Sequence, residues 1–328
     1  MRINRMKTER AGRLAIAAAF LVFAGCASTR VASPDHLRHD IAAAESSYRQ
    51  LAPDHTRAYN ATLGSIARDL NLATPAELHS ELRDTGITID EPAMKLPLVR
   101  YHAVPTTPPR NELSALGAPV VLEYDTGRAP IYPRAGMFLP ATAVYRRVHN
   151  RAHLSFLPAA NEIALGRSIY PLATDKAAAT SMLVRRARTV AQSGLTNLLH
   201  PDVRAKAEIV LTQPYDPDKI PILLVHGLQS TPVTFLKLVT ALESDPEIAR
   251  RFQFWHFYYS TGTPVLLNAL RLRQQLERTV RLVDPNDDDF ATHRIVVVGH
   301  SMGGLLTHTL VSSSGDRLWT SLFVVPPE

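Results

Sequence analysis

The sequence RIVVVGHSMGGLL, residues 294–306, carries the clearest indication of the fold. A β-branched run ends at Gly299, and an apolar pattern with helical spacing begins just after Met302. Between them lies Gly-x-Ser-x-Gly, which in a strand-turn-helix setting holds a serine, here Ser301, as a nucleophile above the edge of a sheet. Gly299 and Gly303 would let the strand and helix backbones approach closely. Because both flanking elements are of the right type, we prefer this nucleophile elbow to a chance match in a Gly/Ser-rich loop.

Length and composition indicate a globular protein with room for an α/β domain and a second, smaller region. The 328 residues are 45% hydrophobic and 20% charged, which is ordinary for a soluble globular chain. Of the formal net charge of +6, residues 1–13 account for +4. The remaining charge is too small for a nucleic-acid-binding footprint, and we expect no nucleic-acid partner.

The N-terminal sequence is typical of a secretion signal. The basic residues 1–13 are followed by the uncharged segment 14–25 and then by Cys26, the only cysteine. The uncharged segment is too short to span a membrane, so residues 1–25 are predicted to be a signal peptide. Phe23-Ala-Gly-Cys26 resembles the bacterial lipobox, although Phe23 departs from the leucine usual there. This resemblance implies a lipid anchor at Cys26, an outer-membrane location facing the periplasm, and a tether over residues 26–39; the alternative is a plain signal peptide with an incidental thiol.

Two segments precede the elbow region. Residues 40–91 have helical periodicity, with a short helix predicted from Pro75 after the N-cap Thr74. Residues 92–205 are predicted to be a mixed β and helical region: recurrent prolines over 92–171 predict a small, irregular β-containing segment, and one long helix follows over 173–199. The histidines of this segment lack metal-motif spacing and nearby acidic residues in sequence, so we expect no metal site at His102, His149 or His153.

From residue 206 onward the pattern alternates between strands and helices. This alternation indicates the α/β class, with a parallel sheet and crossover helices. Its predicted strands are 207–212, 220–225, 252–259, 295–299 and 322–325. The acidic loop 284–289 lacks calcium-loop spacing, and we interpret it as a solvated connection.

The chemistry of a serine nucleophile requires further groups. A general base must take the hydroxyl proton, and fixed N–H donors must stabilise the oxyanion, each worth about 3 kcal/mol. We expect the backbone N–H of Met302 to be one donor and that of Leu228, after the strand 220–225, to be the second. His226 lies beside that turn, and we assign it a structural hydrogen-bonding role in preference to that of the base.

Two motifs together carry a family resemblance. Ile-Leu-Leu-Val-His226-Gly227 is similar to the oxyanion strand and loop, and Val-Val-Gly299-His-Ser-Met-Gly-Gly304 to the nucleophile elbow, of esterase/lipase-like α/β-hydrolases. The resemblance covers residues 206–325 and implies that 206–328 is the first portion of an α/β-hydrolase domain. It also implies an ester or acyl substrate, no cofactor, and a triad in the chain order Ser, acid, His.

The chain departs from this pattern after Ser301. Its only downstream histidine is His308, on the same predicted helix, and Glu328 is a weak candidate for the triad acid. We therefore expect a C-terminally truncated portion of a longer hydrolase, or else a natural short form without the base. The sequence predicts a membrane-anchored serine hydrolase that is inactive as given; the alternative is a non-catalytic envelope lipoprotein with a binding or structural role.

Overall fold

The computed structural model describes residues 34–53, 56–104, 115–127, 129, 131–158, 162–190, 207–313 and 315–322. Cys26 and Glu328 lie outside these residues, so the lipidation site and the acid candidate remain predictions. Within the described ranges, no helix is both long and apolar enough to cross a membrane.

Three helices begin the described chain. They are α1 (Pro34–Arg49), α2 (Arg57–Asp69) and α3 (Pro75–Leu82). As predicted, Thr74 caps α3, and its side chain and that of Glu77 form a reciprocal capping box. The expected tether over residues 26–39 is wrong in its last part, because α1 already begins at Pro34 and buries Leu37.

The next segment, predicted to be a small, irregular β-containing region over 92–171, does contain strands, but they form a regular five-stranded sheet. Its strand order is β1-β5-β4-β3-β2, antiparallel except for the parallel pair β1–β5. The strands are β1 (Thr88–Asp90), β2 (Leu98–Ala103), β3 (Ala118–Tyr124), β4 (Met137–Val148) and β5 (Arg151–Pro158). Prolines 119, 140 and 158 are accommodated within these strands. A separate hairpin follows, β6 (Glu162–Leu165) with β7 (Ser168–Pro171).

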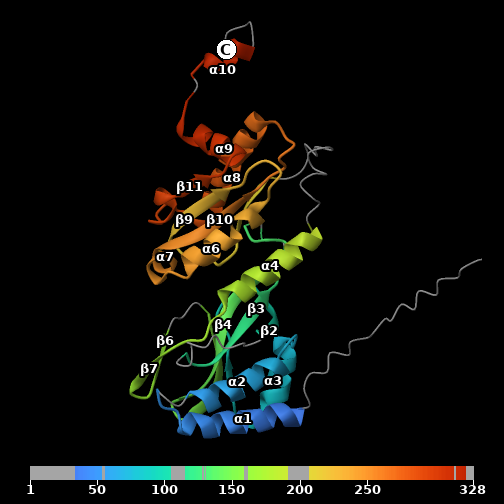
Figure 1. Ribbon diagram of the computed structural model, residues 1–328, viewed down its shortest axis with the longest axis vertical. Helices are drawn as coiled ribbons and strands as arrows, with labels where there is room; N and C mark the ends of the chain where they lie inside the picture. The colour runs from blue at the N-terminus through green and yellow to red at the C-terminus, as the bar shows by residue number, and fades with distance from the viewer. Residues whose placement is uncertain are drawn as a thin grey trace, which may run out of the picture. The chain divides into compact units, whose positions relative to one another are not determined.

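Helices cover both faces of this sheet (Figure 1). One face packs its alternate residues Val120, Leu122 and Tyr124 against α1–α3, so the predicted helical region 40–91 and the strands share one core. The other face contacts α4 (Lys176–Val190), where Val121 and Phe138 pack on Ala179. The predicted helix 173–199 is thus present from residue 176 to residue 190, and residues 191–199 lie outside the described part.

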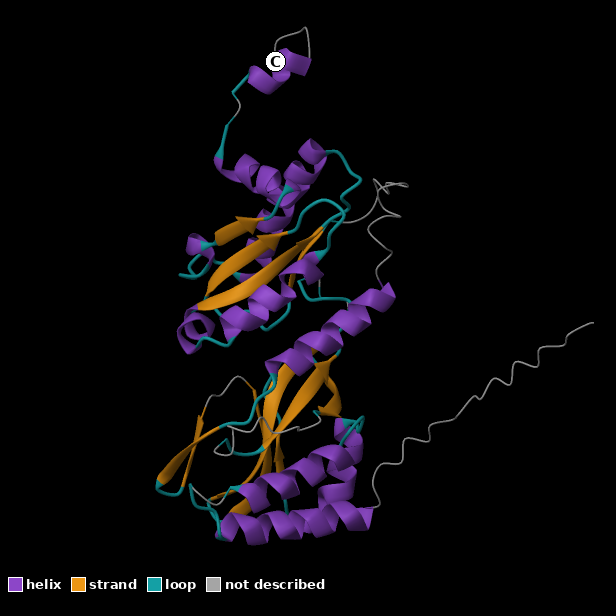
Figure 2. Cartoon of the chain, in the orientation of Figure 1, coloured by secondary structure: helices purple, strands orange, loops and turns teal. Residues whose placement is uncertain are grey.

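The elbow region contains a four-stranded sheet of order β11-β9-β10-β8 (Figure 2). The strands are β8 (Glu208–Leu211), β9 (Ile220–Val225), β10 (Phe252–Tyr258) and β11 (Val296–Gly299). β9 pairs in parallel with both β10 and β11, as predicted, but β8 is antiparallel to β10. The sheet is therefore mixed and not purely parallel, within the α/β class.

Crossover helices lie on both faces of this sheet (Figure 1). The 3₁₀ turn η2 (Pro232–Phe235), α6 (Leu236–Glu243) and α7 (Pro246–Arg251) connect β9 to β10, and α8 (Val265–Val283) leads from β10 toward β11. Helix α9 (Met302–Val311) follows β11 and packs on α8.

The register assigns alternate residues of each strand to the two faces. Leu223, Val225, Trp255 and Phe257 join the core under α8 and α9. Leu224 and Phe254 pack under α6 and α7 with Phe235 and Val239. Leu238 of α6 is 46% exposed.

The end of the described chain differs from expectation. Leu322, predicted to begin a strand over 322–325, ends the helix α10 (Arg317–Leu322). Residues 323–325 lie outside the described part, so the remainder of that strand stays a prediction.

Candidate functional site

The elbow lies where the order of the second sheet reverses. From β9 the chain proceeds to β10 on one side and then returns to β11 on the other side. Carboxyl ends of parallel strands share one edge of a sheet, and a crevice forms at such a reversal. Ser301 and the loop after β9 both follow these ends, because Gly299 pairs with Val225.

Ser301 has a strained backbone. Its φ and ψ are 55° and −122°, at the N-cap of α9. Few residues other than glycine adopt positive φ, and such conformations cost about 1–3 kcal/mol each. Two short hydrogen bonds close the turn: Gly303 N–H donates to His300 O at 2.9 Å, and Gly304 N–H donates to Ser301 O at 2.8 Å.

The close approach expected at Gly299 and Gly303 is present. A Cβ atom at Gly303 would lie 2.1 Å from Val225 O, and one at Gly299 would lie 2.5 Å from Gly303 O. Neither position has room for a side chain, so helix α9 rests directly on the ends of β9 and β11. This contact fixes the height of Ser301 above the sheet.

The loop after β9 lies against the elbow. His300 N–H donates to Val225 O at 3.0 Å, and a Cβ atom at Gly227 would be 3.0 Å from Ser301 Cβ. Leu228, the residue next to Gly227, is 49% exposed. The fold therefore brings together Ser301 and the two residues predicted to supply N–H donors, Leu228 and Met302.

These backbone donors are open. Among the described residues, neither Leu228 N–H nor Met302 N–H donates a hydrogen bond. Met302 is the first residue of α9, where unsatisfied N–H groups and the helix dipole favour a negative charge. Ser301 is exposed, and its hydroxyl has no hydrogen-bond partner within the described ranges.

His226 is buried and supports the loop. Its Nδ1 donates to Gly227 O at 3.0 Å, because a carbonyl can only accept, which leaves Nε2 unprotonated in the neutral ring. Burial lowers the pKa of His226 to about 4. Among the described residues the ring makes no hydrogen bond with the Ser301 hydroxyl, and its bond to Gly227 O fits the structural role expected for it.

Tyr259, which the sequence analysis did not single out, holds the same loop. Its ring stacks on His226 with centroids 4.3 Å apart, and its hydroxyl donates to His226 O at 2.5 Å. A tyrosine at the end of a predicted aromatic strand is the only sequence signal for this role. The contact anchors the chain directly before Gly227.

Among the described residues, no side chain forms a hydrogen bond with the Ser301 hydroxyl that would mark it as the general base. His308 is exposed on α9, and its Nδ1 lies 3.1 Å from the hydroxyl of Ser312, one turn further along the helix. As expected, it is therefore not positioned to take a proton from Ser301. None of the other described carboxylates and histidines forms a hydrogen bond with this serine.

Two histidines have acidic partners that the sequence did not predict. His102 Nε2 lies 2.7 Å from Glu123, and His153 Nδ1 lies 3.0 Å from Asp90. The expectation that these histidines lack acidic companions is wrong, because strand pairing brings distant residues together. Both carboxylates also pair with arginine, so these groups are satisfied and form structural networks.

The acidic loop is exposed to solvent over residues 285–288, in line with its interpretation as a solvated connection, but its first carboxylate is buried. Asp284 is buried and accepts hydrogen bonds from Thr292 Oγ1 at 2.6 Å and from the N–H groups of Asp288 and Asp289. These bonds hold the pKa of Asp284 below its usual value, led by the one from Thr292. The carboxylate closes the loop before β11.

Comparison with known proteins adds no relative: no protein-family model, curated protein or solved structure matches the chain.

Proposed function

We propose that residues 207–313 form the catalytic part of an α/β-hydrolase and that the protein is a serine hydrolase acting on carboxylic esters or related acyl groups. The observation that carries the proposal is the strained, exposed Ser301 at the reversal point of the sheet, directly against the loop 226–228. This is the strand-turn-helix arrangement in which a serine is held as a nucleophile.

The proposed reaction is acyl transfer. Ser301 Oγ would attack the carbonyl carbon of the ester, and the carbonyl oxygen would take the negative charge. The N–H groups of Leu228 and Met302 are proposed to bind that oxyanion, and their lack of other acceptors in the described chain favours this role. As the ester C–O bond breaks, the alcohol would leave with the proton given up by the Ser301 hydroxyl, and water would then hydrolyse the acyl-serine to release the acid and restore that hydroxyl.

A fluorophosphonate probe tests the nucleophile. It forms a covalent bond to an activated serine, and its phosphonyl oxygen occupies the oxyanion position. We expect slow labelling of Ser301, because an oxyanion site without a base retains about 10³–10⁴-fold acceleration over water. Ser301→Ala should abolish the labelling, and Ser312→Ala, on the exposed end of the same helix, should leave it unchanged. Absence of labelling at Ser301 would refute the proposal.

Turnover by the 328-residue chain should be very low. Enzymes of this kind lose several orders of magnitude in kcat without the triad histidine. Hydrolysis of a p-nitrophenyl ester at no more than trace rate is therefore expected, with the same residual rate in His308→Ala. Robust hydrolysis would show that another group serves as the base.

The second candidate is a non-catalytic lipoprotein that uses the same scaffold for binding or envelope structure. It is favoured because, among the described residues, no histidine or carboxylate forms a hydrogen bond with the Ser301 hydroxyl. The fluorophosphonate experiment distinguishes the hydrolase from the non-catalytic lipoprotein. In the non-catalytic protein, Ser301 should react with the probe no faster than free serine does.

For either function we propose a lipid anchor at Cys26 in a bacterial envelope, on the strength of the Phe23–Cys26 motif. Expression in a bacterium fed an alkyne-tagged palmitate should label the protein, and Cys26→Ser should remove the label. Labelling that persists in Cys26→Ser would refute lipidation at this cysteine.

A further inference from the structure

A second pocket lies away from the elbow. It has a volume of about 890 Å³, within the range of about 300–1,000 Å³ that is typical of small-molecule sites. Its walls come from β4, β5 and α4 of the first sheet region and from β10, α6 and α7 of the second, all within one structural unit. Neither the elbow nor the loop 226–228 lines it.

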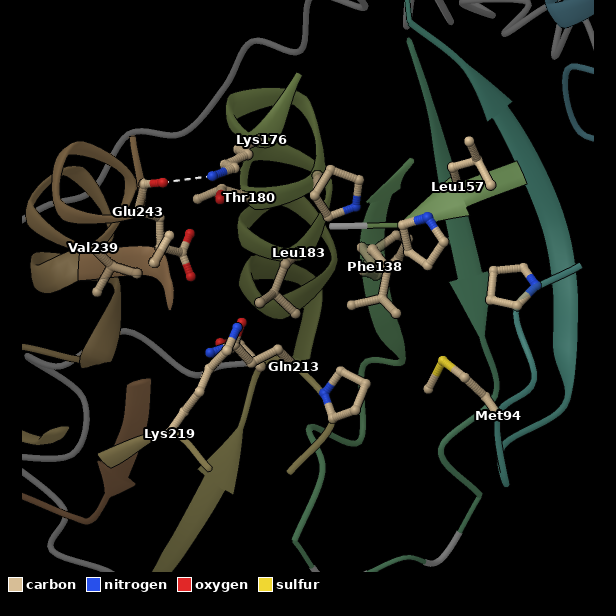
Figure 3. Close-up of a pocket in the computed structure, with 18 of the residues that line it drawn as sticks. Met94, Phe138, Leu157, Lys176, Thr180, Leu183, Gln213, Lys219, Val239 and Glu243 are labelled. Carbon is tan, nitrogen blue, oxygen red and sulfur yellow. Dashed lines mark hydrogen bonds between the residues drawn. The ribbon is translucent and has the colours of Figure 1, made fainter. Parts of the chain in front are cut away.

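One side of this pocket is apolar. It is formed by Met94, Phe138, Leu157 and Leu183, and Val239 of α6 also faces the space (Figure 3). An apolar wall of this kind binds an apolar group of a ligand, since about 25 cal/mol is gained for each Å² removed from water.

The other side carries two lysines with unused donors. Lys176 Nζ donates to the backbone O of Glu243 at 2.5 Å, and within the described chain no carboxylate lies within 4.0 Å of it. Lys219 has only a long pair, 3.9 Å from Asp216. Figure 3 shows Lys219 beside Gln213 and across from Glu243. An ammonium group has three N–H donors, so both lysines retain donors for an acceptor in the pocket.

His256 provides an independent sign that a polar ligand group enters. It lines the pocket from β10 and is 1% exposed, yet neither ring nitrogen has a hydrogen-bond partner among the described residues. Buried polar atoms without partners are rare in native proteins and call for an explanation. A bound ligand that accepts or donates a hydrogen bond here would supply one.

We propose that this pocket binds an anionic amphiphile, namely a monocarboxylate with an extended apolar chain. The carboxylate would accept hydrogen bonds from Lys176 and Lys219, and the chain would lie against Phe138, Leu157 and Leu183. Glu243 also faces the pocket, and burial raises the pKa of its carboxyl against the opposing effect of the two lysines.

Calorimetric titration of the full chain with dodecanoate, below its micellar concentration, tests the proposal. We expect saturable binding of one molecule per chain. Dodecanol, which lacks the charge, and dodecyltrimethylammonium, which reverses it, should each bind at least about tenfold more weakly. Equal or tighter binding of either comparator, or no saturable binding of dodecanoate, would overturn the proposal.

Variants locate the site. Lys219→Met and Leu183→Asp should each weaken dodecanoate binding about tenfold, the first by removing a donor and the second by placing a like charge on the apolar wall. Lys237→Met, at an exposed lysine of α6 outside the pocket, is the matched control and should bind normally. Ser301→Ala should also bind normally, which keeps this test separate from that of the hydrolase.

Weaker binding in either control, or unchanged binding in both Lys219→Met and Leu183→Asp, would contradict the assignment of the ligand to this pocket. Melting curves verify that each variant is folded.

Discussion

The two sheet regions differ in whether their polar groups have hydrogen-bond or ion-pair partners. In the first, two carboxylates of the sheet are paired: the buried Glu123 contacts His102 and Arg186, and the half-buried Asp90 contacts His153 and Arg146. Among the described residues of this region, Asp40 Oδ2 and the Tyr124 hydroxyl are nevertheless buried without a hydrogen-bond partner. In the second, Ser301, the N–H groups of Leu228 and Met302, and both ring nitrogens of His256 have no partner in the described chain. Pairing stabilises a fold, whereas an unpaired group kept in place by surrounding structure is available to a ligand. The proposed nucleophile and oxyanion donors thus lie in the second region, whereas the proposed ligand pocket draws residues from both.

The largest expected effect is a loss of stability caused by a substitution within the elbow. Gly303→Ala would place a Cβ 2.1 Å from Val225 O and should lower the free energy of unfolding by about 3 kcal/mol or more. Gly304→Ala is the matched control, because its Cβ would meet nothing closer than 3.7 Å. It should be neutral or stabilise the helix by about 0.5–1 kcal/mol. Urea unfolding of both variants measures the difference; equal stabilities would mean that the close contact is not rigid.

The next effect is a pH dependence that arises from the second region. Burial lowers the pKa of His256 to about 4, below the value of about 6.5 in the unfolded chain. The unfolded state therefore binds the extra proton first, so this contribution to stability is complete above pH 6.5 and is lost as the pH falls toward 4. Relative to wild type, His256→Leu should flatten the decline of the unfolding free energy between pH 6.5 and 5 by about 2 kcal/mol. An unchanged slope would show that the ring is hydrated.

A paired carboxylate of the first region should matter less, but measurably. Glu123→Gln leaves His102 and Arg186 without their charged partner, and we expect a loss of about 1–2 kcal/mol of stability. Glu247→Gln removes an exposed pair with Arg250 and should cost no more than about 0.5 kcal/mol. Thermal unfolding of both variants at neutral pH measures the contrast, and a Glu247 effect as large as that of Glu123 would contradict it.

The smallest effect compares two helix starts, one in each region. Thr74 caps α3 through its side chain, and Thr74→Ala should cost about 1 kcal/mol. Thr231 precedes η2 at the equivalent position, followed by proline, but its side chain makes no capping hydrogen bond. Thr231→Ala should therefore leave the stability unchanged within about 0.3 kcal/mol. If both substitutions cost the same, the capping box contributes nothing.

The sequence predicted the elements around the elbow well because local signals specify them. A β-branched run, a Gly-x-Ser-x-Gly turn and an apolar helical pattern place β11, Ser301 and α9 within a residue of the structure. Thr74 followed by Pro75 likewise located the start of α3.

Features made by distant residues were predicted poorly. The proline-rich pattern of 92–171 concealed a regular sheet, because strand pairing and not local propensity decides it. For the same reason the partners of His102 and His153, on neighbouring strands, were missed, and so was the antiparallel direction of β8. Tyr259 acts through a stacking contact across 33 residues of sequence, which no spacing rule reveals.

The backbone of Ser301 has a consequence for laboratory evolution. Its φ of 55° is one that glycine adopts without strain, so the residue proposed for chemistry is also one that weakens the fold. A library at this position that is screened only for resistance to heat or protease should drift toward glycine and gain about 1 kcal/mol. A library screened for reaction with an ester should retain serine. If glycine replaces Ser301 in the stability screen and serine is kept in the ester screen, the serine is retained for reaction and not for stability.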